Sequence, residues 1–167
     1  YQAEELEAWL AQFHRSEAAL IFNSGFDANL GIFSSVPQRD DTILYDKLIH
    51  ASIHDGIRLS YAKSYSFKHN DVEDVRRLIR QSTGQVYIAV ESLYSMDGDI
   101  APLADLASLC KETGALLIID EAHATGVFGP EGRGLAIEDD ILEQCIARVY
   151  TFGKAIGAKG AVVVGAF

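Results

Sequence analysis

The sequence predicts an α/β protein whose mostly parallel β-sheet is flanked by helices on both faces. Strand-like and helix-like segments alternate along all 167 residues. The strand-like segments are continuous apolar runs, which are typical of parallel strands buried on both sides. No repeat, low-complexity tract or linker interrupts the series, and a chain of this length can bury a core. We therefore expect one layered domain.

The N-terminal half is predicted from helical periodicity and short apolar runs. Leu6, Trp9, Leu10 and Phe13 recur at helical spacing, so the chain opens with an amphipathic helix. The elements expected after it are a strand over 18–22, a helix from the turn at 23–25 to about residue 33, a strand over 42–45, a helix over 52–61, a strand over 64–67 and a helix over 71–81.

Local signals fix several boundaries in the second half. Asn70 or Asp71 caps the helix over 71–81, with Glu73 in its first turn. Gly114 ends a helix that begins at Leu103. The remaining expected elements are strands over 86–90, 115–119, 149–152 and 161–164, and helices over 103–113 and 141–147.

Composition excludes some classes of function. The net charge is −10 and the isoelectric point about 4.8, so no basic stripe is available to bind nucleic acid. No apolar run approaches the length of a membrane span.

Cys110 and Cys145 have no paired spacing, which predicts a reduced, cytoplasmic compartment. The chain opens on Tyr1 without an initiator Met and closes on Phe167 in an apolar run, so we expect it to be the middle of a longer polypeptide.

Polar side chains recur where the predicted strands end. In an open parallel sheet, ligands bind outside the carboxyl ends of the strands. The residues that fall there are Ser24, His50, Glu91, Asp120, His123, Thr151 and Lys154. Their convergence predicts a single site at this edge of the sheet.

Asp120 and Lys154 suggest which chemistry this site performs. Each follows an apolar strand, and Lys154 lies in a turn of small residues. A lysine amine can form a Schiff base with pyridoxal 5'-phosphate, and a carboxylate can keep the pyridine nitrogen of that cofactor protonated. The acidic and histidine side chains at Asp120, Glu121 and His123 are also more than packing would require of a strand end.

Other interpretations of single motifs remain open. Ser24, Gly25 and Phe26 form a strand–turn–helix junction that could bind a phosphate or could be an ordinary capped helix start. His50 could stack on a flat cofactor or could be a cap. Asp120 and His123 could bind a metal, although no second cluster with ligand spacing is present.

The glycine-rich segment 129–134 is not a dinucleotide site, because it follows no predicted strand and opens no predicted helix. We expect a flexible loop there. No phosphate-binding GxxxxGK[ST] motif is present, and Ser24 has no triad partners.

Four segments together resemble the α-oxoamine synthases, a group of fold-type I enzymes that depend on pyridoxal phosphate. The similarity extends over essentially the whole chain. The segments are His50-Ala51-Ser52-Ile53 with Asp55-Gly56, Glu91-Ser92 through Ser95-Met96-Asp97-Gly98, Asp120-Glu121-Ala122-His123-Ala124-Thr125-Gly126, and Thr151-Phe152-Gly153-Lys154-Ala155. Ile49 and Gly153 depart from the family pattern, in which Asn and Ser are frequent at these two positions.

The resemblance implies a role for each site residue. Lys154 would be the Schiff-base lysine and proton carrier, Asp120 would pair with the pyridine nitrogen, and His50 would stack on the ring. The remaining roles fall to His123 and Ser95 at the phenolic oxygen, to Gly25 and Phe26 at the phosphate with help from Thr151 and the neighbouring Ser24, and to Glu91 as support at the strand end. No metal is expected.

The resemblance also implies an aspartate aminotransferase-like large domain. Residues 1–167 would be its central part, without the N-terminal arm and the small C-terminal domain that holds an arginine for the substrate carboxylate. Such enzymes are homodimers. The implied reaction is a decarboxylating condensation of an amino acid with an acyl-CoA thioester, an acyl transfer that gives an α-oxoamine.

The amino-acid sequence of residues 90–99 and 151–155 is most similar to that of family members that join L-alanine to a pimeloyl thioester in biotin synthesis. Alternatives are a 2-amino-3-ketobutyrate CoA ligase, a serine palmitoyltransferase-like enzyme, another fold-type I enzyme such as an aminotransferase or aldolase, and a non-catalytic homologue with the same fold.

Overall fold

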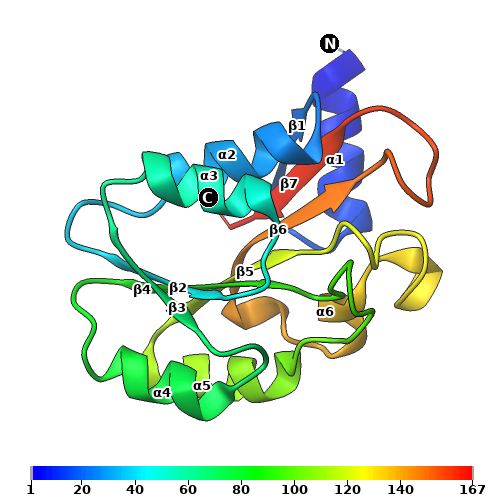
Figure 1. Cartoon of the computed structure of the whole chain (residues 1–167). Coiled ribbons are helices and arrows are strands. Elements are labelled where there is room, and N and C mark those ends of the chain that lie inside the picture. The colour runs from blue at the N-terminus through cyan, green and yellow to red at the C-terminus, as the bar shows by residue number, and fades with distance from the viewer. Residues whose placement is uncertain (1, 167) are drawn as a thin grey trace.

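The fold is a seven-stranded, mostly parallel sheet between layers of helices, as the sequence predicts (Figure 1). The structure is a computed structural model that describes residues 2–166, so Tyr1 and Phe167 lie outside it. The strand order is β1-β7-β6-β5-β4-β2-β3. The strands are β1 (Ala18–Phe22), β2 (Thr42–Asp46), β3 (Lys63–Phe67), β4 (Val86–Glu91), β5 (Leu116–Asp120), β6 (Cys145–Thr151) and β7 (Ala161–Gly165).

Strand direction determines where the polar strand ends meet. β3, β2, β4, β5 and β6 run parallel, whereas β7 is antiparallel to both β6 and β1. The register aligns Glu91 with Asp120, and Asp120 with Val149 two residues before the end of β6. The carboxyl ends of β4, β5 and β6 therefore lie together at one edge of the sheet.

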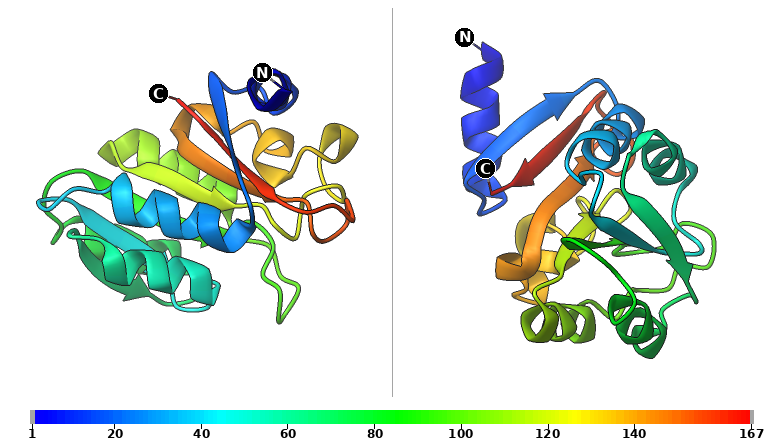
Figure 2. Two further views of the ribbon diagram at one scale, coloured as in Figure 1. Left: turned by 90° about the horizontal axis from the view of Figure 1, so that it is seen from above. Right: turned by 90° about the vertical axis from the view of Figure 1, so that its left-hand side faces the viewer.

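Helices cover both faces of the sheet (Figures 1 and 2). α2 and α3 lie together on one face and α4 and α5 on the other, while α1 packs beside β1 and β7. The helices are α1 (Gln2–Phe13), α2 (Gly25–Ser35), α3 (Ala51–Leu59), α4 (Val72–Ile79), α5 (Leu103–Thr113) and α6 (Leu135–Glu138). Asp71 caps α4 by accepting the N–H of Asp74, and Gly114 ends α5 in the left-handed conformation, as expected.

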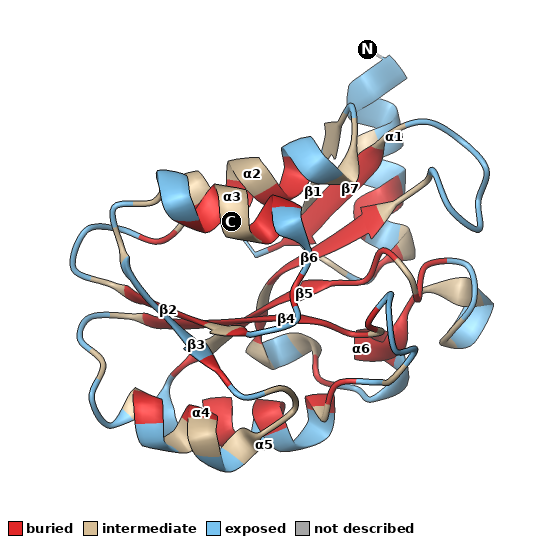
Figure 3. Cartoon of the chain, in the orientation of Figure 1, coloured by how far each residue is buried: buried red, intermediate tan, exposed pale blue. Residues whose placement is uncertain are grey.

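The core has one part on each face of the sheet, and the central strands are buried along their length (Figure 3). A smaller cluster joins α1 to β6 and β7 through Leu10, Tyr150 and Val162. The buried Arg148 side chain fixes the end of α1, because it donates to the carbonyl of His14 at 2.8 Å and to the hydroxyl of Tyr150 at 2.9 Å. None of the helices within residues 2–166 combines the length and apolar character that crossing a membrane requires.

Two local predictions were wrong. Residues 141–147 do not form a helix, because only a single 3₁₀ turn at Leu142–Gln144 precedes β6, which begins at Cys145. The segment 129–134 is not a free loop either. It contains a 3₁₀ turn (Pro130–Gly132), it opens α6, and its backbone is tied by the bonds Gly126 N–H to Gly132 O and Gly134 N–H to Phe128 O.

Candidate functional site

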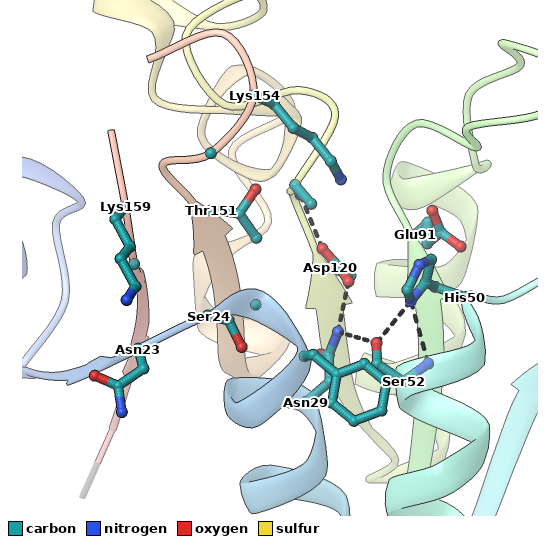
Figure 4. A pocket seen from close by; sticks show the side chains of 15 residues that line it. Asn23, Ser24, Asn29, His50, Ser52, Glu91, Asp120, Thr151, Lys154 and Lys159 are labelled. Atoms are coloured by element: carbon teal, nitrogen blue, oxygen red, sulfur yellow. Dashed lines mark hydrogen bonds between the residues drawn. The ribbon is translucent and has the colours of Figure 1, made fainter. Parts of the chain in front are cut away.

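A pocket of about 420 Å³ lies at the carboxyl ends of β4, β5 and β6, where the starts of α2 and α3 close it (Figure 4). The sequence places polar residues at these strand ends, and the fold brings most of them together. The lining residues are Asn23, Ser24, Gly25, Phe26, Asn29, His50, Ser52, Glu91, Asp120, Ala122, Thr151, Gly153, Lys154, Lys159 and Gly160.

Asp120 is a buried carboxylate at the end of β5. One carboxylate oxygen accepts the N–H of Ala122 at 2.8 Å, and the other accepts the side-chain amide of Asn29 at 2.8 Å. Both bonds hold the charged group in one orientation at the floor of the pocket (Figure 4). A carboxylate held in this way can receive a hydrogen bond from a protonated ring nitrogen.

His50 precedes α3 and caps its first turn. Its Nδ1 atom lies 2.8 Å from the hydroxyl of Ser52 and accepts the N–H of Ser52 at 3.1 Å. These bonds fix the imidazole over the pocket near Asp120 (Figure 4). A planar side chain in this place can stack on a flat ligand.

Lys154 lies in the turn after β6, and its Nζ atom is 2.9 Å from Nε2 of His123. Partial burial lowers the pKa of Lys154, and the nearby charges of Asp120 and Glu91 oppose this effect. Burial also lowers the pKa of His123, with a further contribution from the Lys154 charge. Both shifts favour the uncharged forms, so this pair can hold and pass a proton.

Glu91 ends β4 beside these groups and is almost fully buried. Burial, followed by repulsion from Asp120, raises the pKa of Glu91 to about 7. The two carboxylates therefore differ in environment. Glu91 can gain or lose its proton near neutral pH.

The opposite end of the pocket has the features of a phosphate site. The start of α2 lines it through Ser24, Gly25 and Phe26, and a helix start favours anions. The buried hydroxyl of Thr151 has no hydrogen-bond partner within residues 2–166. A Cβ atom on Gly25 would lie 2.3 Å from Cγ2 of Thr151, so only glycine leaves this space open. These residues fit the phosphate of pyridoxal 5'-phosphate.

Ser24 caps α2 rather than offering a free hydroxyl. Its Oγ accepts the N–H of Asp27 at 3.1 Å and donates to the carboxylate of Asp27 at 2.9 Å. Ser95 is exposed in the turn after β4 and does not line the pocket. Of the sequence-predicted site residues within 2–166, Ser95 is therefore the one that the structure leaves apart, since His123 joins the others through Lys154.

Glu121 has a structural place that the sequence did not suggest. It is fully buried, and its carboxylate accepts hydrogen bonds from the hydroxyl of Ser92 and from the N–H groups of Leu135 and Ala136 at the start of α6.

Within the described chain, no three His, Cys, Asp or Glu side chains are placed to bind a metal ion. Asn29, Ser52 and Lys159 are lining residues to which the sequence had given no role.

Comparison with known proteins identifies the family. The chain matches the family described as aminotransferase class I and II over residues 1–166. It is 45% identical over 177 residues to the 8-amino-7-oxononanoate synthase of Emericella nidulans, and the match covers 97% of this chain and 43% of that protein.

Solved structures give the same result. Sphingomonas wittichii serine palmitoyltransferase has a TM-score of 0.93 and 37% identity, covering 99% of this chain and 42% of that one. The 8-amino-7-oxononanoate synthase of Francisella tularensis has a TM-score of 0.85 and 39% identity, covering 98% and 48%. A further serine palmitoyltransferase structure, with PLP as an internal aldimine, has a TM-score of 0.91 and 37% identity, covering 96% and 41%.

The chain therefore belongs to the aminotransferase class I and II family, and within it to the α-oxoamine synthases, as the sequence predicts. Pyridoxal phosphate, the cofactor expected from the sequence, agrees with these matches. The chain spans between about two-fifths and one-half of the length of these relatives.

Proposed function

We propose that the protein containing this chain, as a member of the α-oxoamine synthases, is an acyltransferase that condenses an amino acid with an acyl thioester and releases carbon dioxide. The observation that carries the proposal is the convergence of Lys154, Asp120 and His50 on one pocket whose other end presents an unpartnered threonine hydroxyl and a helix start (Figure 4). Residues 1–167 would form the central part of the large cofactor-binding domain.

Each residue has a chemical task in this proposal. The amine of Lys154 would hold the cofactor, and Asp120 would accept a hydrogen bond from its ring nitrogen. His50 would cover the ring face, and His123 would donate to the phenolic oxygen. The backbone N–H groups of Gly25 and Phe26 and the hydroxyl of Thr151 would bind the phosphate. Bound pyridoxal phosphate would supply an electron-accepting ring.

Proton transfer falls to Lys154. The lowered pKa of this amine increases its uncharged fraction near neutral pH, as a base requires. The free amine would remove the α-proton of the amino acid, and the α-carbon would then form a bond to the thioester carbonyl carbon while the bond from that carbon to sulfur breaks and the thiolate leaves. Loss of the carboxyl group as carbon dioxide leaves an electron pair on the α-carbon, and the proton held by Lys154 returns to it to give the α-oxoamine. His123, 2.9 Å from the amine, is placed to share its proton.

The substrates proposed are L-alanine and a pimeloyl thioester such as pimeloyl-CoA, the pair used in biotin synthesis. The support is the name 8-amino-7-oxononanoate synthase, borne by a relative 45% identical and by a matching structure 39% identical. A serine palmitoyltransferase-like reaction is the second candidate, because such a structure has the TM-score of 0.93. A homodimer with the sites at its interface and a cytoplasmic location complete the proposal.

The test uses the full-length protein and the variants Lys154→Ala and Lys154→Arg. With pyridoxal phosphate, the wild type is expected to develop a visible absorbance band that both variants lack, and borohydride should fix the cofactor covalently to Lys154. L-Alanine with pimeloyl-CoA should release free CoA and carbon dioxide, whereas L-serine with palmitoyl-CoA should release much less.

Three outcomes would redirect the proposal. Cofactor binding with turnover only on serine and palmitoyl-CoA would favour the second candidate. Amino-group transfer without release of CoA would indicate an aminotransferase. A wild-type protein that takes up no cofactor would leave a non-catalytic homologue.

A further inference from the structure

Four side chains at the floor of the pocket form a continuous line of hydrogen bonds (Figure 4). We call Asp120, Asn29, Ser52 and His50 the Asn29 relay. Asn29 Nδ2 lies 2.8 Å from Asp120 Oδ2 and 3.0 Å from Ser52 Oγ, and Ser52 Oγ lies 2.8 Å from His50 Nδ1. The side chain of Asn29, on α2, thus connects the end of β5 to the start of α3.

The donor in each bond follows from the chemistry of the groups. A carboxylate can only accept, so the amide group of Asn29 must turn its NH₂ toward Asp120. The second hydrogen of this NH₂ goes to Ser52 Oγ. Because Ser52 Oγ accepts that bond, its own proton is available to His50 Nδ1.

The backbone of Ser52 supplies a second donor to the same atom of His50. The N–H of Ser52 points at His50 Nδ1 from 3.1 Å, and a backbone N–H can only donate. The two donors of Ser52 therefore both favour an Nδ1 atom without a proton, which is the Nε2–H tautomer.

Asn29 occupies a position that an apolar residue would fill at lower cost. It is buried in the body of α2, where asparagine is a poor helix former, and its Oδ1 atom is buried with no partner within residues 2–166. The hydrogen bonds that its side-chain NH₂ group donates to Asp120 and Ser52 offset the cost of burying this polar residue.

We propose that Asn29 and Ser52 are positioning residues that hold His50 as the neutral Nε2–H tautomer and orient Asp120 in the same network. The inference rests on the proposed function, because His50 and Asp120 are the two side chains assigned to the cofactor ring. An imidazole without charge can lie against a protonated pyridine ring without repulsion, and the relay directs a hydroxyl and a backbone N–H at Nδ1.

The tautomer can be measured in the full-length apoprotein labelled with ¹⁵N-histidine, where two-dimensional NMR distinguishes Nδ1 from Nε2 protonation. Wild-type His50 is expected to show the Nε2–H pattern. Ser52→Ala removes the shorter of the two contacts at Nδ1 and leaves only the backbone N–H at 3.1 Å, so the fraction of the Nδ1–H tautomer should rise. Asn29→Leu removes both hydrogen bonds donated by the side-chain amide, so the fraction of His50 protonated on Nδ1 should also rise. Because Asp120 loses one of its two donors, cofactor binding should weaken about tenfold or more.

Ser34→Ala is the matched control, because Ser34 lies on α2 outside the pocket lining and donates to the carbonyl of Gly31 at 3.3 Å. It should change neither the tautomer nor the cofactor affinity. If Asn29→Leu does not fold, Ser52→Ala and the rescue variant Ser52→Thr, which restores a hydroxyl, decide the matter. A wild-type His50 that is protonated on Nδ1, or one whose tautomer is the same in Ser52→Ala, would overturn the inference.

The tautomer measurement needs no cofactor. A protein that fails to bind pyridoxal phosphate but shows an Nε2–H imidazole dependent on Ser52 would contradict the proposed function and leave the relay intact. Normal cofactor binding with an unaffected tautomer in both variants would do the reverse.

Discussion

At the scale of single residues, Glu91 links the pocket to the pH dependence of stability. The raised pKa of about 7 means that the folded protein keeps this proton between its ordinary value of 4.5 and about 7, whereas the unfolded chain releases it. Folding therefore takes up a proton in this window. The contribution of Glu91 to the free energy of unfolding is present below pH 4.5 and is lost as the pH rises to 7.

We predict that Glu91→Gln removes this loss, because the amide has no proton to release. Between pH 4.5 and 7.5, the free energy of unfolding of the wild type should fall relative to that of the variant by up to about 3 kcal/mol. Urea unfolding of the apoprotein at several pH values measures the difference. Parallel pH profiles for the two proteins would contradict the prediction.

Gly25→Ala tests the space at the start of α2. Alanine usually favours a helix, but here its Cβ would meet Cγ2 of Thr151 at 2.3 Å. Thr151 is β-branched and can yield only by turning its hydroxyl away. We expect a loss of about 1–3 kcal/mol in unfolding free energy and weaker cofactor binding.

The control for stability is Gly153→Ala, where the nearest atom to a new Cβ is the carbonyl oxygen of Ala158 at 3.7 Å. Adding Thr151→Ser to Gly25→Ala removes the methyl group from the collision and should recover most of the stability. Equal stability of Gly25→Ala and the wild type would show that the contact is relieved without cost.

Some site residues could be recognised from the neighbouring sequence, and one depends on a contact with a distant part of the chain. Lys154, Asp120 and Glu91 could be predicted because each is a charged side chain directly after an apolar strand, and parallel strands bring their carboxyl ends together. Asn29 could not, since nothing in the sequence distinguishes an asparagine in the middle of a predicted helix from a polar surface residue. Its function depends on a bond to Asp120, 91 positions away in the sequence.

At the scale of elements, α6 depends on a distant carboxylate for its N-terminal bonds. Glu121 lies beyond β5 and accepts the N–H groups of Leu135 at 3.1 Å and Ala136 at 2.8 Å, as well as the hydroxyl of Ser92 at 2.6 Å. Gly134 has no side chain because a Cβ there would lie 2.7 Å from the Glu121 carboxyl group.

We predict that Glu121→Ala lowers the free energy of unfolding by about 3 kcal/mol or more, because it leaves buried donors without acceptors. Hydrogen exchange at the amides of Leu135 and Ala136 should accelerate. Glu138→Ala is the matched control, since Glu138 accepts the N–H of Gly129 at an exposed position and should cost below about 1 kcal/mol. Equal costs for the two variants would refute this assignment.

The error over residues 141–147 has a physical cause at the same scale. Ile141, Leu142, Cys145 and Ile146 have a spacing that suits one face of a helix as well as a strand. Pairing decides between them, because β6 has β5 on one side and β7 on the other. A short stretch of sequence does not show which distant strands it will pair with. Helices with a capping residue and apolar strands bounded by turns were predicted closely.

At the scale of the whole molecule, the alternation of apolar strands and helices was enough to predict the architecture. The sequence could not show that β7 runs antiparallel between β6 and β1. This reversal brings Lys159, which precedes β7, to the side of the pocket that holds Asn23 (Figure 4). The rim of the pocket is thus a consequence of topology rather than of any local motif.

No guanidinium is available for the substrate carboxylate among the described residues that line the proposed cofactor pocket. Among the described residues that line the pocket, the only cations are Lys154 and Lys159, and no arginine is present. Lys154 is assigned to the cofactor, and a planar guanidinium binds a carboxylate better than a flexible amine does. The family resemblance places such an arginine in a C-terminal domain, and the chain covers only 43% of the relative that it matches at 45% identity.

We therefore predict that a polypeptide of these 167 residues does not turn over L-alanine and pimeloyl-CoA, while the full-length protein does. Release of CoA, followed with a thiol reagent, measures turnover in both at equal concentrations of cofactor. Lys154→Ala in the full-length protein sets the background. Turnover by the 167-residue polypeptide above that background would mean that the pocket already holds what binds the substrate carboxylate, and Lys159 would then be the residue to substitute next.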